Sequence, residues 1–341
     1  MIVCDEGHRL KNNNIKAAQL ITKFDCKRRI LLTGTPIQND LQEFYSLINF
    51  VNPGMFGTYQ EYKTKYETPI VQSQEPMVLP CYRELGETRA KELNEITNLF
   101  ILRRTQEIIN KYLPSKQELA IFCKPSELQQ YMIEKVLEFY ETQQNVSGEA
   151  NPLQIINILK KICNHPSLIQ NENASSDLVK YLVQFLPSWK EMGPFDSTKL
   201  SLVENLLAEL IKKNEKIILV SYFTKTLDML MGMCGHYNYK YCRLDGTTTS
   251  SDRSKIVDSF NNPESDTFVF LLSAKAGGVG LNLIGASRLV LYDNDWNPAA
   301  DLQAMSRIWR DGQQKDVYIY RLITAGNKSN YTNEEFIIHC Y

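Results

Sequence analysis

Apolar segments separated by amphipathic stretches dominate the second half of the chain. These segments span residues 217–221, 239–243, 268–272, 289–292 and 317–323. They are nearly continuous in apolar character, as strands buried on both faces of a parallel sheet are. Between them, apolar residues recur at helical spacing, for example at Leu200, Val203 and Leu207. Strands alternating with helices predict an α/β fold with a parallel sheet, whose ligands bind at the carboxyl ends of the strands.

The first part of the chain shows the same alternation less completely. Residues 2–4 and 29–33 are expected to form strands, and a helix is expected after an N-cap at Asn39 or Asp40. Residues 124–195 are helix-rich, and a capping box formed by Ser126 and Gln129 opens the first of these helices.

Three regions are therefore expected. Residues 1–123 form a first region with two strands, residues 124–195 form a helix-rich region with polar loops near 144–151 and 170–177, and residues 196–341 form a parallel-sheet domain.

Composition restricts the classes of protein to which the chain can belong. With 43% hydrophobic and 23% charged residues it has the composition of a globular protein. The net charge of −1 means that any nucleic acid must bind at a local groove. Eight cysteines without a Cys-x-x-Cys pair argue against a zinc site or a disulfide framework. No apolar run approaches the ~20 residues that a membrane helix needs, so no membrane partner is expected.

Two adjacent carboxylates, Asp5 and Glu6, follow the first predicted strand directly. In nucleotide hydrolases, one carboxylate at this position can hold Mg²⁺ while the next orients the attacking water. Asp-Glu after an apolar run is common, however, and taken alone it is more often a solvated turn.

The predicted helix after Pro298 places Gln303, Arg307 and Arg310 on one face, with Leu302, Met305 and Trp309 on another that docks on the sheet. Two arginines pointing outward together suit a phosphoryl group, as arginine fingers do. Judged by spacing alone, a pair of surface ion-pairing arginines is the commoner explanation.

The glycine-rich turn at residues 277–282 could bring backbone N–H groups close to phosphate oxygens. It is not a Walker A sequence, because Lys275 precedes the glycines. A lone glycine turn is more often structural.

Taken in order, nine segments resemble the motifs of SWI/SNF-like ATPases of helicase superfamily two. Asp5-Glu6-Gly7-His8 resembles motif II, and Cys163-Asn164-His165 lies in a segment typical of the family's helical insertion. The other segments are residues 32–39 (motif III), 103–104 with 113–116, 220–224 (motif IV), 243–247, 273–282 (motif V), 295–298 and 303–313 (motif VI). The resemblance implies two RecA-like lobes joined by a helical insertion. Residues 1–123 would be the C-terminal part of the first, incomplete lobe, residues 124–195 the insertion and residues 196–341 the second lobe.

The resemblance also implies cofactors and site residues. ATP would lie between the lobes, with Asp5 holding Mg²⁺, Glu6 aligning water, and Arg307 and Arg310 acting as arginine fingers. Further ATP contacts are expected at His8, Gly280 and Gln303. DNA contacts are expected at Thr35, Asn39, Ser221, Thr224, Lys275 and Trp296.

Within the family, the run at residues 308–313 resembles recombination translocases of the Rad fifty-four type. Nucleosome remodellers usually read His-Arg-Ile-Gly-Gln there. Residues 283–287 and 292–295 also resemble the Rad fifty-four branch, in particular its B paralogue. The resemblance implies a nuclear, ATP-dependent double-stranded-DNA translocase in homologous recombination and double-strand-break repair. Its partners would be duplex DNA, a RecA-like strand-exchange recombinase and chromatin.

Three alternatives stay open: a nucleosome remodeller, a catalytically dead DNA-binding truncation, and an RNA helicase of the DEAH type. The helical insertion disfavours the last of these. The sequence also departs from the family pattern, because it contains no Gly-x-x-x-x-Gly-Lys-Ser/Thr P-loop and carries an apparent insertion at residues 327–331. We therefore expect a fragment that starts at motif II and does not hydrolyse ATP by itself.

Overall fold

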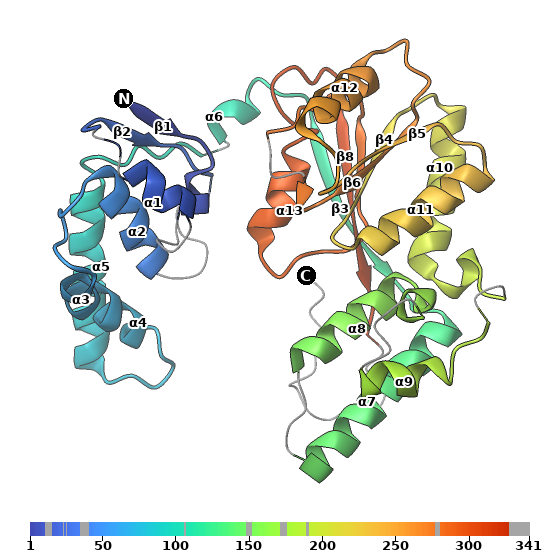
Figure 1. The fold of residues 1–341 in the computed structure, drawn as a ribbon, viewed down its shortest axis with the longest axis horizontal. Coiled ribbons are helices and arrows are strands. Elements are labelled where there is room, and N and C mark those ends of the chain that lie inside the picture. Colours follow the sequence, from blue (N-terminus) through green and yellow to red (C-terminus); the bar gives the residue numbers. More distant parts are fainter. Residues whose placement is uncertain are drawn as a thin grey trace. The chain divides into compact units, whose positions relative to one another are not determined.

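The computed structural model describes residues 1–10, 16–22, 24, 26–34, 41–105, 107–147, 152–170, 176–188, 191–276 and 280–326. The chain divides into two compact units, residues 1–108 and residues 109–341 (Figure 1). Within these described ranges, no helix is both long enough and apolar enough to cross a membrane.

The first unit opens with a two-stranded parallel sheet. β1 (Ile2–Cys4) pairs with β2 (Arg29–Leu31), as the two apolar segments predict. The segments between them include a 3₁₀ turn, η1 (Gly7–Leu10), and α1 (Lys16–Thr22). Leu47 and Phe50 of α2 (Leu41–Val51) are buried against this sheet. The proposed N-cap of α2, Asn39 or Asp40, lies outside the described residues.

Aromatic rings form a second core in the first unit. The helical segments around this core are α3 (Tyr59–Tyr62), a π-helical turn η2 (Lys63–Glu67), α4 (Thr68–Ser73) and α5 (Pro80–Thr97). A further short helix, α6 (Glu107–Asn110), includes the residues at which the first unit ends and the second begins. Tyr62 is fully buried, and its ring centroid lies 5.0 Å from that of Tyr45 and 5.7 Å from that of Tyr66. Tilted pairs at these distances add to the stability gained by burial alone.

The second unit contains a six-stranded parallel sheet of order β3-β8-β7-β4-β6-β5. Its strands are β3 (Lys116–Cys123), β4 (Ile217–Ser221), β5 (Tyr241–Leu244), β6 (Val269–Ser273), β7 (Arg288–Leu291) and β8 (Val317–Thr324). Five of them match the apolar segments expected from the sequence within about two residues. The prediction of a parallel-sheet α/β fold is therefore confirmed.

The sixth strand, β3, belongs to the second unit although it precedes the domain boundary expected at residue 123. β3 pairs with β8 along its whole length, from Lys116 opposite Val317 to Cys123 opposite Thr324. It lies at the edge of the sheet and most of its side chains are exposed, so its sequence lacks a continuous apolar run. The sheet of the second unit therefore includes residues that the sequence assigned to the first lobe.

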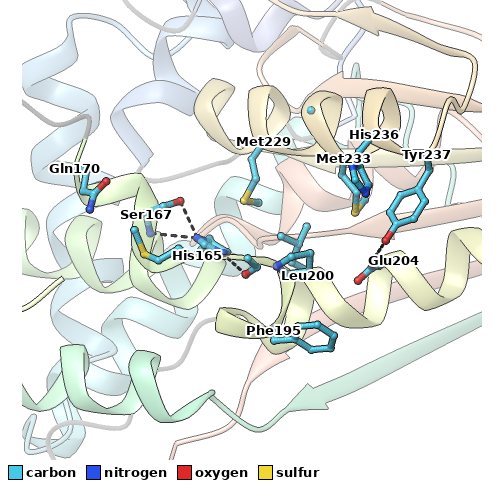
Figure 2. A pocket seen from close by; sticks show the side chains of 14 residues that line it. His165, Ser167, Gln170, Phe195, Leu200, Glu204, Met229, Met233, His236 and Tyr237 are labelled. Carbon is cyan, nitrogen blue, oxygen red and sulfur yellow. Dashed lines mark hydrogen bonds between the residues drawn. The ribbon is translucent and has the colours of Figure 1, made fainter. Parts of the chain in front are cut away.

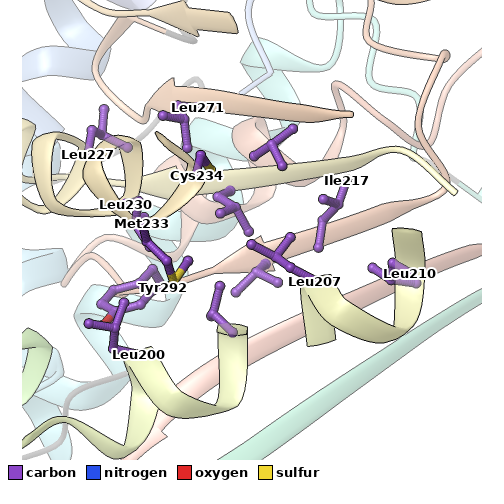
Figure 3. Packing of buried hydrophobic residues seen from close by; sticks show 14 of the residues in the cluster. Leu200, Leu207, Leu210, Ile217, Leu227, Leu230, Met233, Cys234, Leu271 and Tyr292 are labelled. Carbon is purple, nitrogen blue, oxygen red and sulfur yellow. The ribbon is translucent and has the colours of Figure 1, made fainter. Parts of the chain in front are cut away.

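Helices cover both faces of this sheet (Figure 1). On one face, α10 (Thr198–Lys212) and α11 (Thr224–His236) pack on the sheet through Leu207 and Leu230 (Figure 3). On the other face, α12 (Ser250–Asn261) and α13 (Pro298–Met305) contribute Phe260 and Met305 to a separate core. Strands covered on both sides must be apolar throughout, which explains the continuous runs in the sequence.

The helical insertion has a core of its own. It comprises α7 (Glu127–Ser147), α8 (Pro152–Asn164), the 3₁₀ turns η3 (Pro166–Ile169) and η4 (Pro194–Asp196), and α9 (Asp177–Val183). The predicted capping box is present, since Ser126 N–H donates to Gln129 Oε1 (3.0 Å) and Gln129 N–H donates to Ser126 Oγ (3.1 Å). The loop expected from residue 144 begins later, because α7 continues to Ser147.

Candidate functional site

The backbone turns sharply where β1 ends, at Asp5 and Glu6. Glu6 has a φ of 49°, in the left-handed region that residues other than glycine rarely adopt. Its N–H donates to Asp5 Oδ1 (2.8 Å), and the N–H of Gly7 donates to Leu32 O (2.8 Å). A Cβ atom on Gly7 would lie 2.2 Å from Leu31 Cγ, so the turn needs glycine at this point. The turn leaves the Asp5 side chain exposed and that of Glu6 partly exposed, at the carboxyl end of the strand.

This end of the first sheet fits the magnesium prediction by its chemistry. β1 and β2 are parallel, so the residues after Cys4 and after Leu31 meet at the same edge. Carboxylate oxygens such as those of Asp5 are the donors that Mg²⁺ prefers. Thr35 and Asn39 lie outside the described residues, as does the side chain of His8.

In the second unit, the helix that was expected to carry the two arginines ends early. α13 stops at Met305. The N–H of Ser306 still donates to the fourth preceding residue, Leu302 O (2.9 Å), but the N–H of Arg307 donates to the third, Ala304 O (3.2 Å), and that of Ile308 does the same with Met305 O (3.3 Å). The prediction that Gln303, Arg307 and Arg310 share one helical face is therefore wrong. Leu302, predicted to dock on the sheet, is 48% exposed.

The turn after α13 nevertheless joins motif VI to motif V. Arg310 Nη1 donates to the carbonyl oxygens of Leu281 (3.0 Å) and Gly280 (3.4 Å). Arg307 is buried, and its carbonyl oxygen accepts the N–H of Leu283 (2.9 Å). Gly280 is exposed, with a φ of 34°, whereas residues 277–279 lie outside the described part of the chain. The structure thus brings Gly280 and Arg310 together, and these contacts fix where the guanidinium of Arg310 lies.

Trp309 joins motif VI to the segment that leads into β3. Its Nε1 donates to the carbonyl oxygen of Pro114 (2.9 Å), and Lys116 Nζ lies 4.6 Å from the centroid of its ring. Residues 195 positions apart in the sequence are therefore in direct contact.

Three of the predicted DNA-contacting residues are exposed at the carboxyl edge of the six-stranded sheet. Thr224 opens α11 after β4, Lys275 follows β6, and Trp296 follows β7 with 61% of its surface exposed. These strands are neighbours in the order β7-β4-β6. A hydroxyl at a helix N-terminus, an ammonium and an aromatic ring on one edge are groups that contact a nucleic-acid backbone.

Ser221 differs from the other predicted DNA contacts because it is fully buried. Its hydroxyl donates to Asp293 Oδ2 (2.5 Å), so direct contact with DNA does not agree with this conformation. Asp293 also accepts the N–H of Tyr222 (2.7 Å) and the Asn164 side-chain amide (2.6 Å). Burial raises the pKa of Asp293, while these hydrogen bonds act in the opposite direction.

Asp293 and Asn164 were missed as a pair by sequence reasoning. Asn164 lies in the segment that resembles the family's helical insertion, and its amide donates to both Asp293 and Thr226 Oγ1 (3.2 Å). It thereby fastens the insertion helix α8 to the loop after β7 and to α11. Only the order of motifs could have drawn attention to Asn164, because its partners are distant in sequence.

A second buried carboxylate, Asp301, organises the loop before Trp296. Its Oδ1 accepts the Tyr222 hydroxyl (2.9 Å) and the N–H of Asp295 (3.3 Å), and its Oδ2 accepts Arg321 Nη1 (3.3 Å). Burial raises the pKa of Asp301. The loop that carries Trp296 is therefore held at both ends, by Asp293 and by Asp301.

A separate hollow of about 820 Å³ lies between the insertion and helices α10 and α11 (Figure 2). His165 lines it, and its Nε2 lies 3.1 Å from Gly193 O while its Nδ1 lies 2.7 Å from Ser167 Oγ. Burial lowers the pKa of His165. Because both ring nitrogens are engaged, His165 holds the 193–197 segment in place and is a poor candidate for acid–base catalysis.

Comparison with known proteins finds two family models in the chain. The SNF2-related domain matches residues 1–168, and the helicase conserved C-terminal domain matches residues 198–312. The DNA repair and recombination protein RAD54B of Gallus gallus is 50% identical over 96% of this chain, and the DNA repair protein rhp54 of Schizosaccharomyces pombe is 44% identical over 96%. The chain spans 38% and 39% of the length of these two relatives.

Among solved structures, the Sulfolobus solfataricus SWI2/SNF2 ATPase core in complex with dsDNA is 27% identical, covering 95% of this chain and 64% of that one, with a TM-score of 0.49. The two family models follow one another along the chain. Residues 5–8 and 32–39 fall in the first, and residues 220–224, 273–282 and 303–312 fall in the second. The chain therefore belongs to the SNF2-related family, with a helicase conserved C-terminal domain after its SNF2-related domain.

Proposed function

We propose that this chain is part of an ATP-dependent double-stranded-DNA translocase that acts in homologous recombination and double-strand-break repair. The observation that carries the proposal is the arrangement of the second unit. Arg310 is held against the motif V turn, while Thr224, Lys275 and Trp296 are exposed at the ends of three adjacent strands. A phosphate-binding arginine and a backbone-binding edge on one sheet are what a nucleotide-driven DNA motor requires. The relatives named DNA repair and recombination proteins support the biological setting.

The nucleotide contacts divide between the two units. Asp5 would hold Mg²⁺ and Glu6 would orient the attacking water, both at the carboxyl end of β1. Arg307 and Arg310 would contact the phosphoryl group, with His8, Gly280 and Gln303 as further ATP contacts. Magnesium bound with ATP neutralises charge on the phosphate oxygens.

The DNA contacts would be made mainly with phosphates. Thr224, Lys275 and Trp296 carry this part of the proposal, and Thr35 and Asn39 are its counterparts in the first unit. Because few of these groups can read base edges, binding should tolerate any sequence and weaken steeply with salt. A net charge of −1 is compatible with this behaviour when the basic and aromatic groups are gathered on one edge.

The proposed translocase function also implies biological partners. A motor of this kind would work in the nucleus, on duplex DNA within chromatin, beside a RecA-like strand-exchange recombinase.

ATP hydrolysis stimulated by duplex DNA tests the proposal. Since the chain contains no P-loop sequence, we expect the 341 residues alone to be inactive. A chimaera that carries a P-loop-containing segment of an SNF2-related protein ahead of Met1 can supply this motif. In that chimaera, Glu6→Gln should abolish DNA-stimulated turnover, by about a hundredfold or more, and leave duplex binding unchanged, because the carboxylate acts on water.

The conservative change Glu43→Gln, in α2 of the same unit, serves as the matched control and should keep full turnover. If Glu6→Gln is as active as this control, Glu6 does not have the proposed role. If the unaltered chimaera folds but shows no stimulation by DNA, the translocase proposal itself is wrong.

A further inference from the structure

The last turn of α8 lies against two of the three loops that carry exposed candidate DNA contacts. Lys160 Nζ donates to the carbonyl oxygen of Asn294 (3.1 Å) and lies 5.4 Å from the centroid of the Trp296 ring. The neighbouring Lys161 Nζ lies 5.8 Å from the ring of Phe223, which precedes Thr224. The insertion therefore touches the loop after β4 and the loop after β7 at the same time.

The position of the Trp296 ring depends on this contact. With 61% of its surface exposed, the ring has little packing of its own to hold it in one orientation. The ammonium of Lys160 lies over the face of the Trp296 ring in a cation–π contact. The ammonium is held in this position by its hydrogen bond to the carbonyl oxygen of Asn294. A ring that is ordered before DNA arrives loses less conformational freedom on binding, and affinity rises accordingly.

We propose that the helical insertion is part of the duplex-binding surface, with Lys160 as a positioning residue that holds the Trp296 ring against the sugar–phosphate backbone. This inference rests on the proposed function, because it assigns Trp296 to the DNA track. It adds to that function a contribution from the insertion, which carries none of the residues assigned above to ATP or DNA.

A second lysine of the insertion offers a matched control. Lys135 Nζ in α7 also lies over aromatic rings, 5.5 Å from the centroid of Tyr131 and 5.3 Å from that of Phe185, and it pairs with Glu138 (2.7 Å). Phe185 packs against the core of the insertion and Tyr131 lies on α7, so neither ring belongs to the loops after β4 and β7. Lys160 and Lys135 thus share residue type and kind of contact, and they differ in whether the ring belongs to the DNA-contacting edge.

The test is fluorescence anisotropy of a labelled DNA duplex with the 341-residue chain. Lys160→Met keeps most of the side-chain length and removes the charge, and it should weaken binding about fivefold, the equivalent of losing one partly desolvated cation–π contact. Lys160→Arg should restore binding, because a guanidinium also stacks on aromatic faces. In a Trp296→Ala background, Lys160→Met should have less than about a twofold further effect, since the two residues act as one unit.

Tryptophan emission gives a readout that a merely structural role would not move. The contribution of Trp296 is obtained as the difference between the chain and its Trp296→Phe variant. That contribution should shift in Lys160→Met and return in Lys160→Arg, whereas Lys135→Met should leave both the emission and DNA affinity unchanged.

Two results would overturn the inference while leaving the proposed function standing. One is duplex affinity of Lys160→Met equal to that of Lys135→Met. The other is an equal loss from Lys160→Met with and without the Trp296 ring. A folded, unaltered chain that binds no duplex would overturn the proposed function and this inference together.

Discussion

Replacing Asn164 by alanine should destabilise the second unit by about 2–3 kcal/mol. The amide of Asn164 donates to the buried carboxylate of Asp293 (2.6 Å) and to Thr226 Oγ1 (3.2 Å). A hydrogen bond to an ionised acceptor contributes roughly 1.5–3 kcal/mol, and one between neutral groups about 1 kcal/mol. Two effects favour the lower end of the range that the sum of these two contributions spans. Burial raises the pKa of Asp293, and Asn164 Oδ1 is a buried atom that accepts no hydrogen bond from the described residues.

Equilibrium unfolding in urea, followed by tryptophan fluorescence, measures the decrease in the free energy of unfolding of the second unit. The three tryptophans, Trp189, Trp296 and Trp309, all belong to residues 109–341, so their emission reports on the second unit. Gln154→Ala is the matched control on the same helix, because Gln154 is exposed and donates to Ser176 Oγ (2.6 Å). We expect it to cost less than about 0.5 kcal/mol.

A loss for the Asn164 variant no greater than that of the control would refute the reasoning. It would mean that the carboxylate of Asp293 finds water or another donor once the amide is gone. The carboxylate would then not depend on the insertion for its hydrogen bonds.

The remaining predictions concern the first unit, which has no tryptophan and is best followed by hydrogen exchange of its amides. Gly7→Ala should destabilise the turn after β1 by about 1–3 kcal/mol and speed exchange in both strands, because its Cβ would lie 2.2 Å from Leu31 Cγ; unchanged exchange would show that Leu31 can move aside. Hydrogen bonds, the largest effect coming from Lys65, hold the pKa of Glu92 at about 2, below its usual value of 4.5. Its stabilising contribution is therefore present above pH 4.5 and is lost as the pH falls toward 2, and Glu92→Gln should show a smaller acid-dependent rise in exchange of α5 than the unaltered chain.

The features that sequence predicted correctly are those fixed by local pattern. Strands such as β4 and β6 are buried on both faces, so their apolar runs mark them directly. The capping box at Ser126 depends on residues three positions apart and needs no tertiary contact. The order of the motif segments was equally visible, because it is a property of the sequence itself.

The features that sequence missed depend on partners far apart in the chain. β3 is an edge strand whose exposed side chains give no apolar signal, and only its pairing with β8 reveals it. The end of α13 at Met305 is decided by tertiary contacts, among them the bond from Leu283 N–H to Arg307 O, although helical spacing continues to Arg310. The burial of Ser221 follows from Asp293, 72 residues away.

The contact of Trp309 with Pro114 has a consequence for how the sequence around it can change during evolution. The indole donates to a main-chain oxygen, which every amino acid supplies, so the contact does not depend on which side chain stands at that position. It does depend on the number of residues between Pro114 and the start of β3 at Lys116, because one more or one fewer would carry the carbonyl out of reach of the ring. In related chains that retain the tryptophan, this contact therefore constrains the length of the segment at residues 113–115 and not its composition.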